Sequence, residues 1–383
     1  MDFDFSWILL GLPVAFTLGW LASRVDLRQL RIENRQAPKA YFKGLNFLLN
    51  EQQDQAIDAF IEAVQNDPDT SELHFALGNL FRRRGEYERA VRVHEHLLQR
   101  GDLPTPDRDR AQHALALDYL KAGLLDRAEL ALRKLEGTAF EDQARLALLS
   151  IYERSADWQH ASDIATKLNS GSPGNFSGRL AHYLCEQART VASAGDATKA
   201  TLLLEQAHSQ APQAARPLID LAKLNQQRND PAAALSKLQQ LERCAPQALP
   251  LAAAVLVAIA QTISLAPAVV ALLKKHYANT PSVDVMDALA ALEKDPAISS
   301  QAYIDHLQTE ASLIAAARWV AGEQVGTERD THHTLVERAL TKAIQPLLRY
   351  RCAACGFEAS QHFWHCPGCQ AWDSYPARRI EEL

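Results

Sequence analysis

Apolar residues recur every three to four positions along most of this chain, which is the spacing of amphipathic helices. Small and large apolar residues follow one another in a repeated order, and a proline closes several of the segments. This order is typical of two antiparallel helices that cross at small side chains and enclose a large one, with proline ending the second helix. The first such unit contains Gly44, Phe47, Ala56, Phe60, Ala63 and Pro68.

The same order recurs at intervals of about 34 to 39 residues, and we count about six units. These units resemble tetratricopeptide repeats, each of which needs a neighbour to bury its apolar face and therefore stacks into a superhelix. The later units are marked by Gly85 and Tyr87, by Tyr119 and Gly123, by Tyr152 and Trp158, by Ala188 and Gly195, and by Leu221 and Ala234.

We assign residues 37–249 to these repeats. Residues 250–346 keep a helical pattern without the clean repeat, so we expect further helical hairpins that cap the superhelix. The composition agrees, because 47% of the 383 residues are hydrophobic but only 7% are aromatic, which suits an all-α core of Ala and Leu. The formal net charge of -6 gives no overall cationic surface for nucleic acid.

The stretch from Phe5 to Ser23 has no charged residue and is long enough to cross about 30 Å of hydrocarbon as a helix. Asp2 and Asp4 precede it, and a series of basic residues follows it. Positive charge stays on the cytoplasmic side. We therefore predict a transmembrane anchor at residues 1–23 and a basic linker at 24–36. The N-terminus would be periplasmic and the rest cytoplasmic, at the cell inner membrane.

A cleaved signal peptide is the alternative for this segment, but its basic residues would lie on the wrong flank. Within the predicted anchor, Gly11, Ala15 and Gly19 are spaced four residues apart, which places small side chains on one ridge of a helix. Such a ridge lets a second membrane helix approach closely. The alternative is that membrane anchors are simply rich in Gly and Ala.

The first helices of the repeats carry many basic residues, although the whole chain is acidic. If these helices form a concave wall, the wall is a groove for an extended segment with acidic residues, held by arginine side chains. The alternative is a solvated helical face. The candidate groove residues are Arg82, Arg83, Arg110, His113, Lys121, Arg154, Arg189, Arg216 and Lys223.

Two pairs of cysteines stand in the tail, which we assign to residues 347–383. Cys352 and Cys355 form one Cys-x-x-Cys motif, and Cys366 and Cys369 form the other. Two such motifs provide four thiolates, which is a complete tetrahedral shell for one iron or zinc ion. Unmetallated thiols and disulfides are the alternatives. We expect this module to cover the last helices as a lid.

Motifs of enzymes are missing from the sequence. It contains no dinucleotide-binding glycine motif, no phosphate-binding loop and no serine nucleophile motif. We therefore expect a protein that binds others and does not catalyse a reaction.

The order of anchor, repeats and cysteine tail resembles that of the lipopolysaccharide assembly protein B family of Gram-negative bacteria. The tail reads Tyr350-Arg-Cys-Ala-Ala-Cys-Gly-Phe and then Trp364-His-Cys-Pro-Gly-Cys-Gln-Ala-Trp, and it is the most specific part of the resemblance. The resemblance implies a rubredoxin-like domain that packs against the repeats, with the four cysteines as metal ligands.

The resemblance also implies a regulatory function. The family brings the deacetylase of the lipid A pathway to the membrane AAA+ protease that degrades it, and an inner-membrane protein that senses lipopolysaccharide antagonises this adaptor. A homodimer is a further partner that the sequence leaves open. Two other functions remain: a general scaffold for envelope assembly complexes, and an electron-transfer rubredoxin. Against the latter, Gln370 stands where electron-transfer rubredoxins usually have Gly, and the segment between the two motifs is short.

Overall fold

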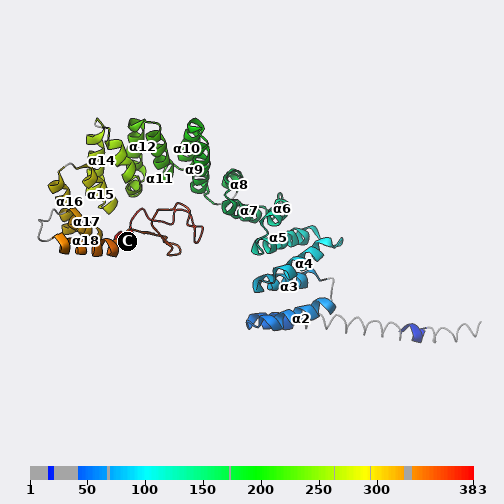
Figure 1. Ribbon diagram of the computed structural model, residues 1–383. Coiled ribbons are helices and arrows are strands. Elements are labelled where there is room, and N and C mark those ends of the chain that lie inside the picture. The colour runs from blue at the N-terminus through cyan, green and yellow to red at the C-terminus, as the bar shows by residue number, and fades with distance from the viewer. Residues whose placement is uncertain are drawn as a thin grey trace, which may run out of the picture. The chain divides into compact units, whose positions relative to one another are not determined.

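The computed structural model describes residues 16–20, 42–66, 70–171, 174–262, 264–293, 295–322 and 330–383. In these ranges the chain is mostly helical, and its only β-strands are two short ones in the tail (Figure 1). The chain divides into two compact units, Met1–Ser155 and Ala156–Leu383. The prediction of stacked helical repeats with a small tail domain is confirmed, and each unit is described by itself below.

The first unit is built of consecutive helices, each packed against the next. Gly44 lies against the ring of Phe60, where an added Cβ would approach the ring to 3.0 Å. Gly78 likewise faces the imidazole of His94. Small residues therefore stand where the helices cross, as the repeat predicts. The helices are residues 42–49, α2 (Gln53–Asn66), α3 (Ser71–Arg84), α4 (Tyr87–Gln99), α5 (Thr105–Lys121), α6 (Leu125–Arg133) and α7 (Glu141–Ser155).

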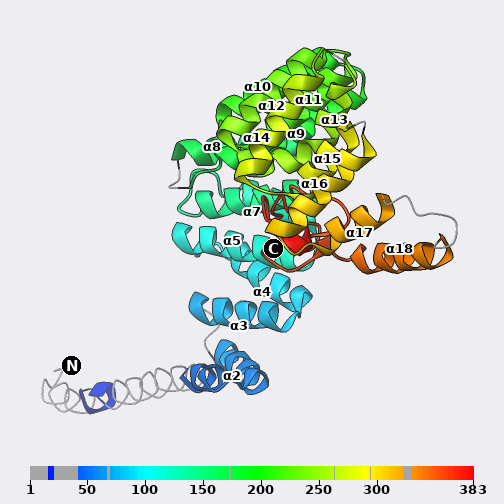
Figure 2. The ribbon, with the colours of Figure 1, turned by 90° about the vertical axis from the view of Figure 1, so that its left-hand side faces the viewer.

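The second unit continues with helical hairpins and ends in the tail. In Figures 1 and 2 the helices α9 to α18 form an arc, and the tail lies on its inner side. The helices are α8 (Trp158–Gly171), α9 (Ser177–Ser193), α10 (Ala197–Gln210), α11 (Ala215–Gln227), α12 (Pro231–Cys244), η1 (Pro246–Ala252), α13 (Ala253–Ala260), α14 (Ala266–Asn279), α15 (Val283–Leu292), α16 (Pro296–Thr309), α17 (Leu313–Gly322), α18 (Asp330–Ile344) and η2 (Ile380–Glu382). The strands are β1 (Tyr350–Arg351) and β2 (Glu358–Ala359), which pair antiparallel.

The turns inside the hairpins explain the repeated glycines. Gly85, Gly123 and Gly195 have φ values of 81°, 77° and 93°, the left-handed conformation that glycine adopts without steric cost. In two other hairpins this place is taken by Ala156 and Asn229, with φ values of 56° and 58°. The turn geometry is therefore kept where the sequence template loses its glycine.

A large core of the second unit joins helices α11 to α15. Leu218, Leu241, Leu256 and Leu273 are fully buried members of one continuous cluster. A second cluster connects α15, α17 and α18, and Leu347 packs against it just before the tail begins. The tail therefore starts from a point that is fixed by the last hairpins.

The predicted anchor lies largely outside the described residues, and this applies to Gly11 and Ala15. Residues 16–20 are helical, and Gly19 has no other atom within 4 Å of its added Cβ. Among the described residues, no helix is both long enough and apolar enough to cross a membrane.

Candidate metal centre and its contacts with the helical wall

The four cysteines of the tail converge on one point. The Sγ atoms of Cys352 and Cys369 are 3.8 Å apart, and those of Cys355 and Cys366 are 3.7 Å apart. All four atoms lie within 4.8 Å of one another. In a tetrahedron the ligand atoms are separated by about 1.6 times the metal–ligand distance, so a metal–sulfur bond of about 2.3 Å requires about 3.8 Å. The cysteines therefore fit one tetrahedral ion.

The two Cys-x-x-Cys motifs are folded by equivalent backbone hydrogen bonds, one in each motif. Gly356 N donates to Cys352 O, and Gln370 N donates to Cys366 O, both at 2.9 Å. Both donors have positive φ, 77° for Gly356 and 61° for Gln370. Gln370 thus takes the conformation that glycine has in the first motif, so its side chain does not prevent a metal-binding knuckle.

The ligands differ in exposure and acidity. Cys352 and Cys366 are buried, and Cys355 and Cys369 are exposed. Burial raises the pKa of Cys352, but the Ser374 hydroxyl, 3.2 Å from its Sγ, and nearby backbone N–H groups outweigh this and lower it to about 6. A lowered pKa favours the thiolate, which is the form that binds a metal.

The neighbouring histidines are occupied by other contacts. The Nε2 atom of His362 lies 3.0 Å from the carbonyl oxygen of Tyr375, and that of His365 lies 3.0 Å from the carbonyl oxygen of Gln370. A four-thiolate shell needs no fifth ligand, and it suits zinc and iron alike. The residues present therefore fit either metal.

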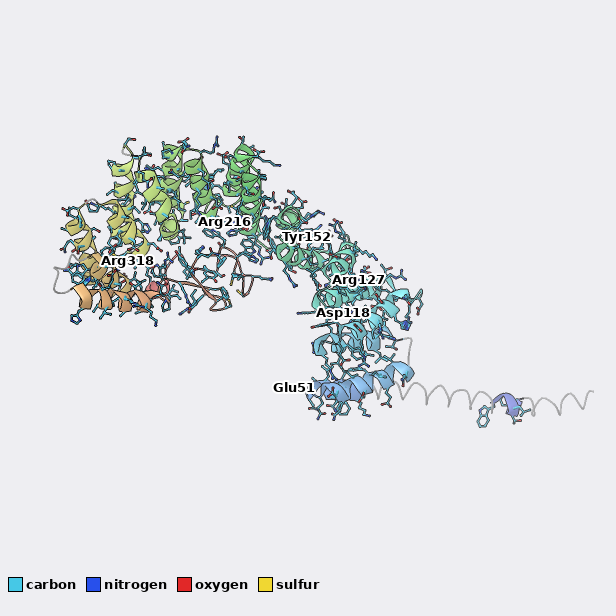
Figure 3. The ribbon with its side chains drawn as sticks, viewed as in Figure 1. Glu51, Asp118, Arg127, Tyr152, Arg216 and Arg318 are labelled. Atoms are coloured by element: carbon cyan, nitrogen blue, oxygen red, sulfur yellow. The ribbon has the colours of Figure 1, made fainter. Side chains whose placement is uncertain are left out.

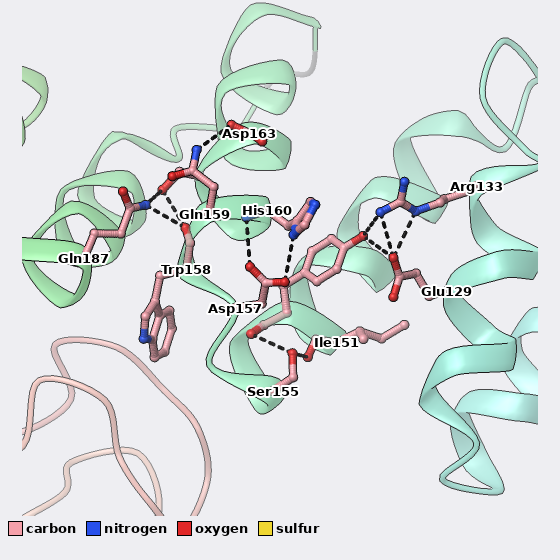
Figure 4. Close-up of polar contacts among 12 residues, drawn as sticks. Glu129, Arg133, Ile151, Ser155, Asp157, Trp158, Gln159, His160, Asp163 and Gln187 are labelled. Carbon is pink, nitrogen blue, oxygen red and sulfur yellow. Dashed lines mark hydrogen bonds and ion pairs between the residues drawn. The ribbon is translucent and has the colours of Figure 1, made fainter. Parts of the chain in front are cut away.

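Two tryptophans of the tail pack against the surface of α8, α9 and α11, which we call the helical wall. The ring of Trp372 stacks on His182 of α9 with 4.7 Å between centroids, and its edge meets Trp158 of α8 at 6.1 Å. Figure 4 shows Trp158 beside the tail, with its carbonyl oxygen accepting a hydrogen bond from Gln187. Trp364 also contacts His182, at 5.9 Å, and packs against the core of α11 to α15.

A chain of hydrogen bonds fixes the tautomer of His182. Its Nε2 atom lies 2.8 Å from an oxygen of Asp373 in the tail. Its Nδ1 atom lies 3.5 Å from Nη1 of Arg216, whose Nη2 donates to Glu186 at 2.7 Å. Since guanidinium can only donate, Nδ1 is the acceptor and Nε2–H is the donor to Asp373. This imidazole joins α9 to the tail.

The residues after the metal motifs fasten the other end of the tail. Arg379 makes a bidentate ion pair with Asp284 of α15, with Nε to Oδ2 at 3.0 Å and Nη2 to Oδ1 at 2.8 Å. Glu381 accepts from the backbone N–H groups of Leu313 and Ile314 at 2.6 and 3.1 Å, which caps the N-terminus of α17. In Figure 2 this end lies beside α17.

Glu382 repeats this capping at a second helix. It accepts from Val283 N at 2.7 Å, at the first residue of α15. The tail is therefore held from α8 to α17: it packs on the last helices, as expected, and also on the earlier helices α8 and α9. The helical wall extends back to α8, where Trp158 and the neighbouring His182 of α9 give the indole ring of Trp372 a surface to pack on.

The candidate residues of the predicted basic groove differ in burial and in pairing, and the groove itself stays a prediction. In the first unit Arg82 pairs with the buried carboxylate of Asp118 at 2.8 Å, and Arg110 pairs with Glu72 at 2.6 Å. His113 stacks on Phe140, with 4.9 Å between centroids. The remaining candidates of this unit, Arg83, Lys121 and Arg154, are exposed.

In the second unit the candidate Arg216 is buried. This residue is only 4% exposed, because it lies under the tail and pairs with Glu186 and Asp220 (Figure 3). Its guanidinium neutralises the buried carboxylate of Glu186 and the half-buried carboxylate of Asp220. Arg189 and Lys223 remain exposed to a greater degree, with 74% and 50% of their side chains accessible.

Sequence analysis missed Trp364, Trp372, Arg379 and Glu381 as contact residues. One signal was present, since two of the six tryptophans of the chain stand on either side of the second cysteine motif. Large aromatic side chains that close to a metal site have no room inside so small a module. They are therefore expected to pack on a neighbouring surface.

The comparisons with known proteins agree with this architecture. The family model described as rubredoxin metal binding domain matches residues 350–375. The chain is 30% identical to lipopolysaccharide assembly protein B of Escherichia coli strain K12, over 98% of this chain and 99% of that protein. It is 28% identical to the protein of the same name from Haemophilus influenzae strain Rd, over 96% of each chain.

Among solved structures, the complex of Naa15/Naa10 bound to HypK-THB is similar to 81% of this chain and 46% of that one, with 13% identity and a TM-score of 0.45. This structural likeness is weak. The sequence identity to lipopolysaccharide assembly protein B, by contrast, extends along nearly the whole chain. By that relationship, this chain belongs to the lipopolysaccharide assembly protein B family.

Proposed function

We propose that this protein is a non-catalytic regulator of lipopolysaccharide assembly that acts as an adaptor at the inner membrane. The observation that carries the proposal is the 30% identity to lipopolysaccharide assembly protein B over 98% of the chain. A match of this extent includes the repeats and the metal tail together. A role that needs both parts is therefore a better conclusion than a role for either part alone.

The metal centre supports a structural role for its ion. Four thiolates complete the coordination shell, which leaves no open position for a substrate or for a reactive water. The tail is also fastened to the helices at both ends, through His182 and through Asp284. Metal binding would therefore stabilise one face of the helical scaffold.

The finer part of the proposal concerns the partners. The protein would bind the deacetylase of the lipid A pathway and present it to the membrane AAA+ protease, and an inner-membrane lipopolysaccharide sensor would oppose it. Residues 1–23 would hold the adaptor in the same membrane as the protease. Tethering raises the effective concentration of both partners without any new contact between them.

The half-life of the deacetylase in cells tests this proposal. Cells depleted of the protein, and cells that express a version without residues 1–23, should both degrade the deacetylase slowly, whereas cells with the full chain should degrade it fast. An unchanged half-life after depletion would remove the adaptor function. A slow half-life after depletion but a fast one without the anchor would retain the adaptor and reject tethering.

Electron transfer is a second candidate, because the ligands Cys355 and Cys369 are exposed. An exposed ligand pair is the edge through which a four-thiolate iron centre would exchange electrons. Visible absorption of the protein as isolated from cells separates the two functions. A ferric centre absorbs visible light and bleaches with dithionite, whereas a zinc centre is colourless.

A further inference from the structure

A pocket of about 320 Å³ lies between the helical wall of the second unit and the tail. Its walls come from α9, α10 and α11, and Trp364 of the tail closes one side. We propose that this pocket docks a protein segment that combines one apolar anchor side chain with adjacent acidic residues. The inference rests on the proposed adaptor function and names the kind of segment that the adaptor would hold.

The floor of the pocket is apolar. It consists of small or aliphatic side chains and one buried thiol, Cys185, which is 1% exposed. Burial raises the pKa of this thiol far above its usual range, so it stays neutral and contributes an apolar surface. The other floor residues are Ala188, Ala192, Ala200, Leu204 and Leu224.

The rim of the pocket is basic. Arg189 from α9 and Lys223 from α11 line it, and most or half of their side-chain surface is accessible. The carboxylates nearby are shared with the buried Arg216: Glu186 lies 2.7 Å from its guanidinium, and Asp220 lies 3.3 Å from it. The guanidinium of Arg216 therefore neutralises part of the negative charge of Glu186 and Asp220. The exposed cations of the rim can then attract an anion.

The rim cations differ in how closely their own carboxylates hold them, since Arg189 Nη2 lies only 2.5 Å from Glu186. The ammonium group of Lys223 is 3.9 Å from Asp220, which is a long separation for an ion pair. Arg189 pairs with Glu186 through one nitrogen, Nη2, and a guanidinium has five N–H donors. Carboxylates of a bound segment would fit here, since arginine binds them with paired hydrogen bonds.

The size of the pocket decides between occupants. A volume of about 320 Å³ lies at the small end of ligand pockets, which span about 300–1,000 Å³. It holds one large apolar side chain, and the charged rim then meets the flanking residues of the same segment. A membrane lipid would need a longer apolar channel than a pocket of this volume, whose lining includes Arg216 and Asp220.

The tail is part of this pocket and does not merely lie beside it. Trp364 stands two residues before the ligand Cys366 and also lines the neighbouring cavity of about 310 Å³, as does Lys223. The seated metal module therefore builds one wall of the docking pocket. A helical wall without its tail would offer the floor and the rim but not the indole.

Binding of labelled peptides to the purified full-length protein in detergent micelles tests the proposal. The probe is the fluorescein-labelled peptide Gly-Asp-Glu-Leu-Asp-Glu-Gly, measured by fluorescence polarisation. Two matched peptides replace its leucine by serine or its acidic residues by lysine. Dodecyl phosphate, added at a low ratio to the detergent, is the competitor that represents a lipid occupant of the pocket. Circular dichroism and metal content confirm that each protein variant is folded.

The protein variants test separately how the basic rim and the apolar floor contribute to peptide binding. We expect Lys223→Glu and Arg189→Glu each to weaken binding of the acidic leucine peptide by about tenfold or more, which corresponds to about 1.4 kcal/mol. Ala192→Phe should fill the pocket and have a similar effect. The matched controls are Lys199→Glu, an exposed lysine on α10, and Ala232→Phe, an exposed alanine on α12; both should bind normally.

Three results would overturn the inference. They are absence of binding by the acidic leucine peptide, equal binding in pocket and control variants, and displacement by dodecyl phosphate with no preference among the peptides. The half-life of the deacetylase in cells carrying Lys223→Glu keeps this test separate from that of the proposed function. Normal degradation in that strain, together with slow degradation after depletion of the whole protein, rejects the pocket and retains the adaptor.

Discussion

His182 and Asp373 lie 191 residues apart in the sequence, yet Nε2 of the imidazole is 2.8 Å from the carboxylate. His182 is 3% exposed, and the carboxylate is half open to solvent, with 60% of its side chain accessible. The pair joins the metal-binding tail to the second unit's first hairpin. Since one partner is buried, breaking the bond leaves an unsatisfied polar atom inside the interface.

The first prediction concerns this pair. His182→Leu should release the tail near Trp372 and lower the free energy of unfolding by about 1 kcal/mol, because the hydrogen bond to Asp373 and the ring stacking on Trp372 are both lost. Hydrogen–deuterium exchange of residues 350–375 measures the release. Asp373→Asn keeps an acceptor oxygen and should have a smaller effect. Equal exchange in His182→Leu and the unchanged protein would contradict this account.

The second prediction concerns the helix cap made by Glu381. Glu381→Gln removes the charge that accepts from the first N–H groups of α17, and it should cost about 1 kcal/mol. Urea denaturation of the second unit's helices measures the loss. Glu310→Gln removes the same charge from an exposed position at the end of α16 and serves as the control. A larger loss in the control would show that the cap is not important.

The third prediction concerns the metal. Replacing Cys352 and Cys355 by serine, or removing the ion with a chelator, should loosen residues 347–383, because metal binding energy is folding energy for such a module. Limited proteolysis should then cut within the tail, and the fluorescence of Trp364 and Trp372 should shift to longer wavelength. Cys244→Ser, which changes a cysteine outside the metal site, is the control. An unchanged melting temperature after the double change would speak against a structural ion.

The fourth prediction concerns the left-handed turn at Gly356. Gly356→Ala should destabilise the first cysteine motif by about 1 kcal/mol through backbone strain alone, since no neighbouring atom lies within 4 Å of an added Cβ. Gly368→Ala meets Phe357 at 3.4 Å, an ordinary contact, and its φ is not in the left-handed range, so it should cost less. Chelator titration of the two variants compares their stabilities. A greater loss for Gly368→Ala would reject the explanation.

The fifth prediction concerns pH. Burial lowers the pKa of His362, which donates to the carbonyl oxygen of Tyr375. In the unfolded chain this group titrates near pH 6.5, so below about pH 6.5 the unfolded state binds more protons than the folded state. The contribution of neutral His362 to stability should therefore be fully present above about pH 6.5. The free energy of unfolding should then decrease as the pH falls toward the lowered pKa of His362.

Urea midpoints at about pH 7.5 and 5.5 measure this dependence on the intact protein. In His362→Asn the decrease between the two pH values should be smaller than in the unchanged chain. It should not vanish, because burial also lowers the pKa of His113 and of His208. The same decrease in both proteins would contradict the assignment.

Much of the fold could be predicted because its signals are local. The spacing of the four cysteines specifies their chemistry, and the order of small and large residues specifies a hairpin, as Gly44 against Phe60 illustrates. The turns at Ala156 and Asn229 were harder to recognise, because a non-glycine residue takes the left-handed conformation there. Propensity is a weak guide where the surrounding helices fix the backbone.

The contacts of the tail could not be predicted from spacing. Whether Arg216 faces solvent or lies under the tail depends on which distant segment covers α11, and the sequence pattern of a helix face is the same in both cases. The pairing of Arg379 with Asp284 likewise joins positions 95 residues apart. Such contacts follow from the curvature of the stacked hairpins, which accumulates over many small rotations.

The distance along the chain between the helical wall and its cover also has a consequence for biosynthesis. At about 5–20 residues per second, a ribosome needs roughly 10–40 s to add the 191 residues that separate His182 from Asp373. Throughout that interval the indole of Trp158 and the imidazole of His182 have left the ribosome without their cover. A nascent chain therefore carries an uncovered aromatic surface until the metal module is complete.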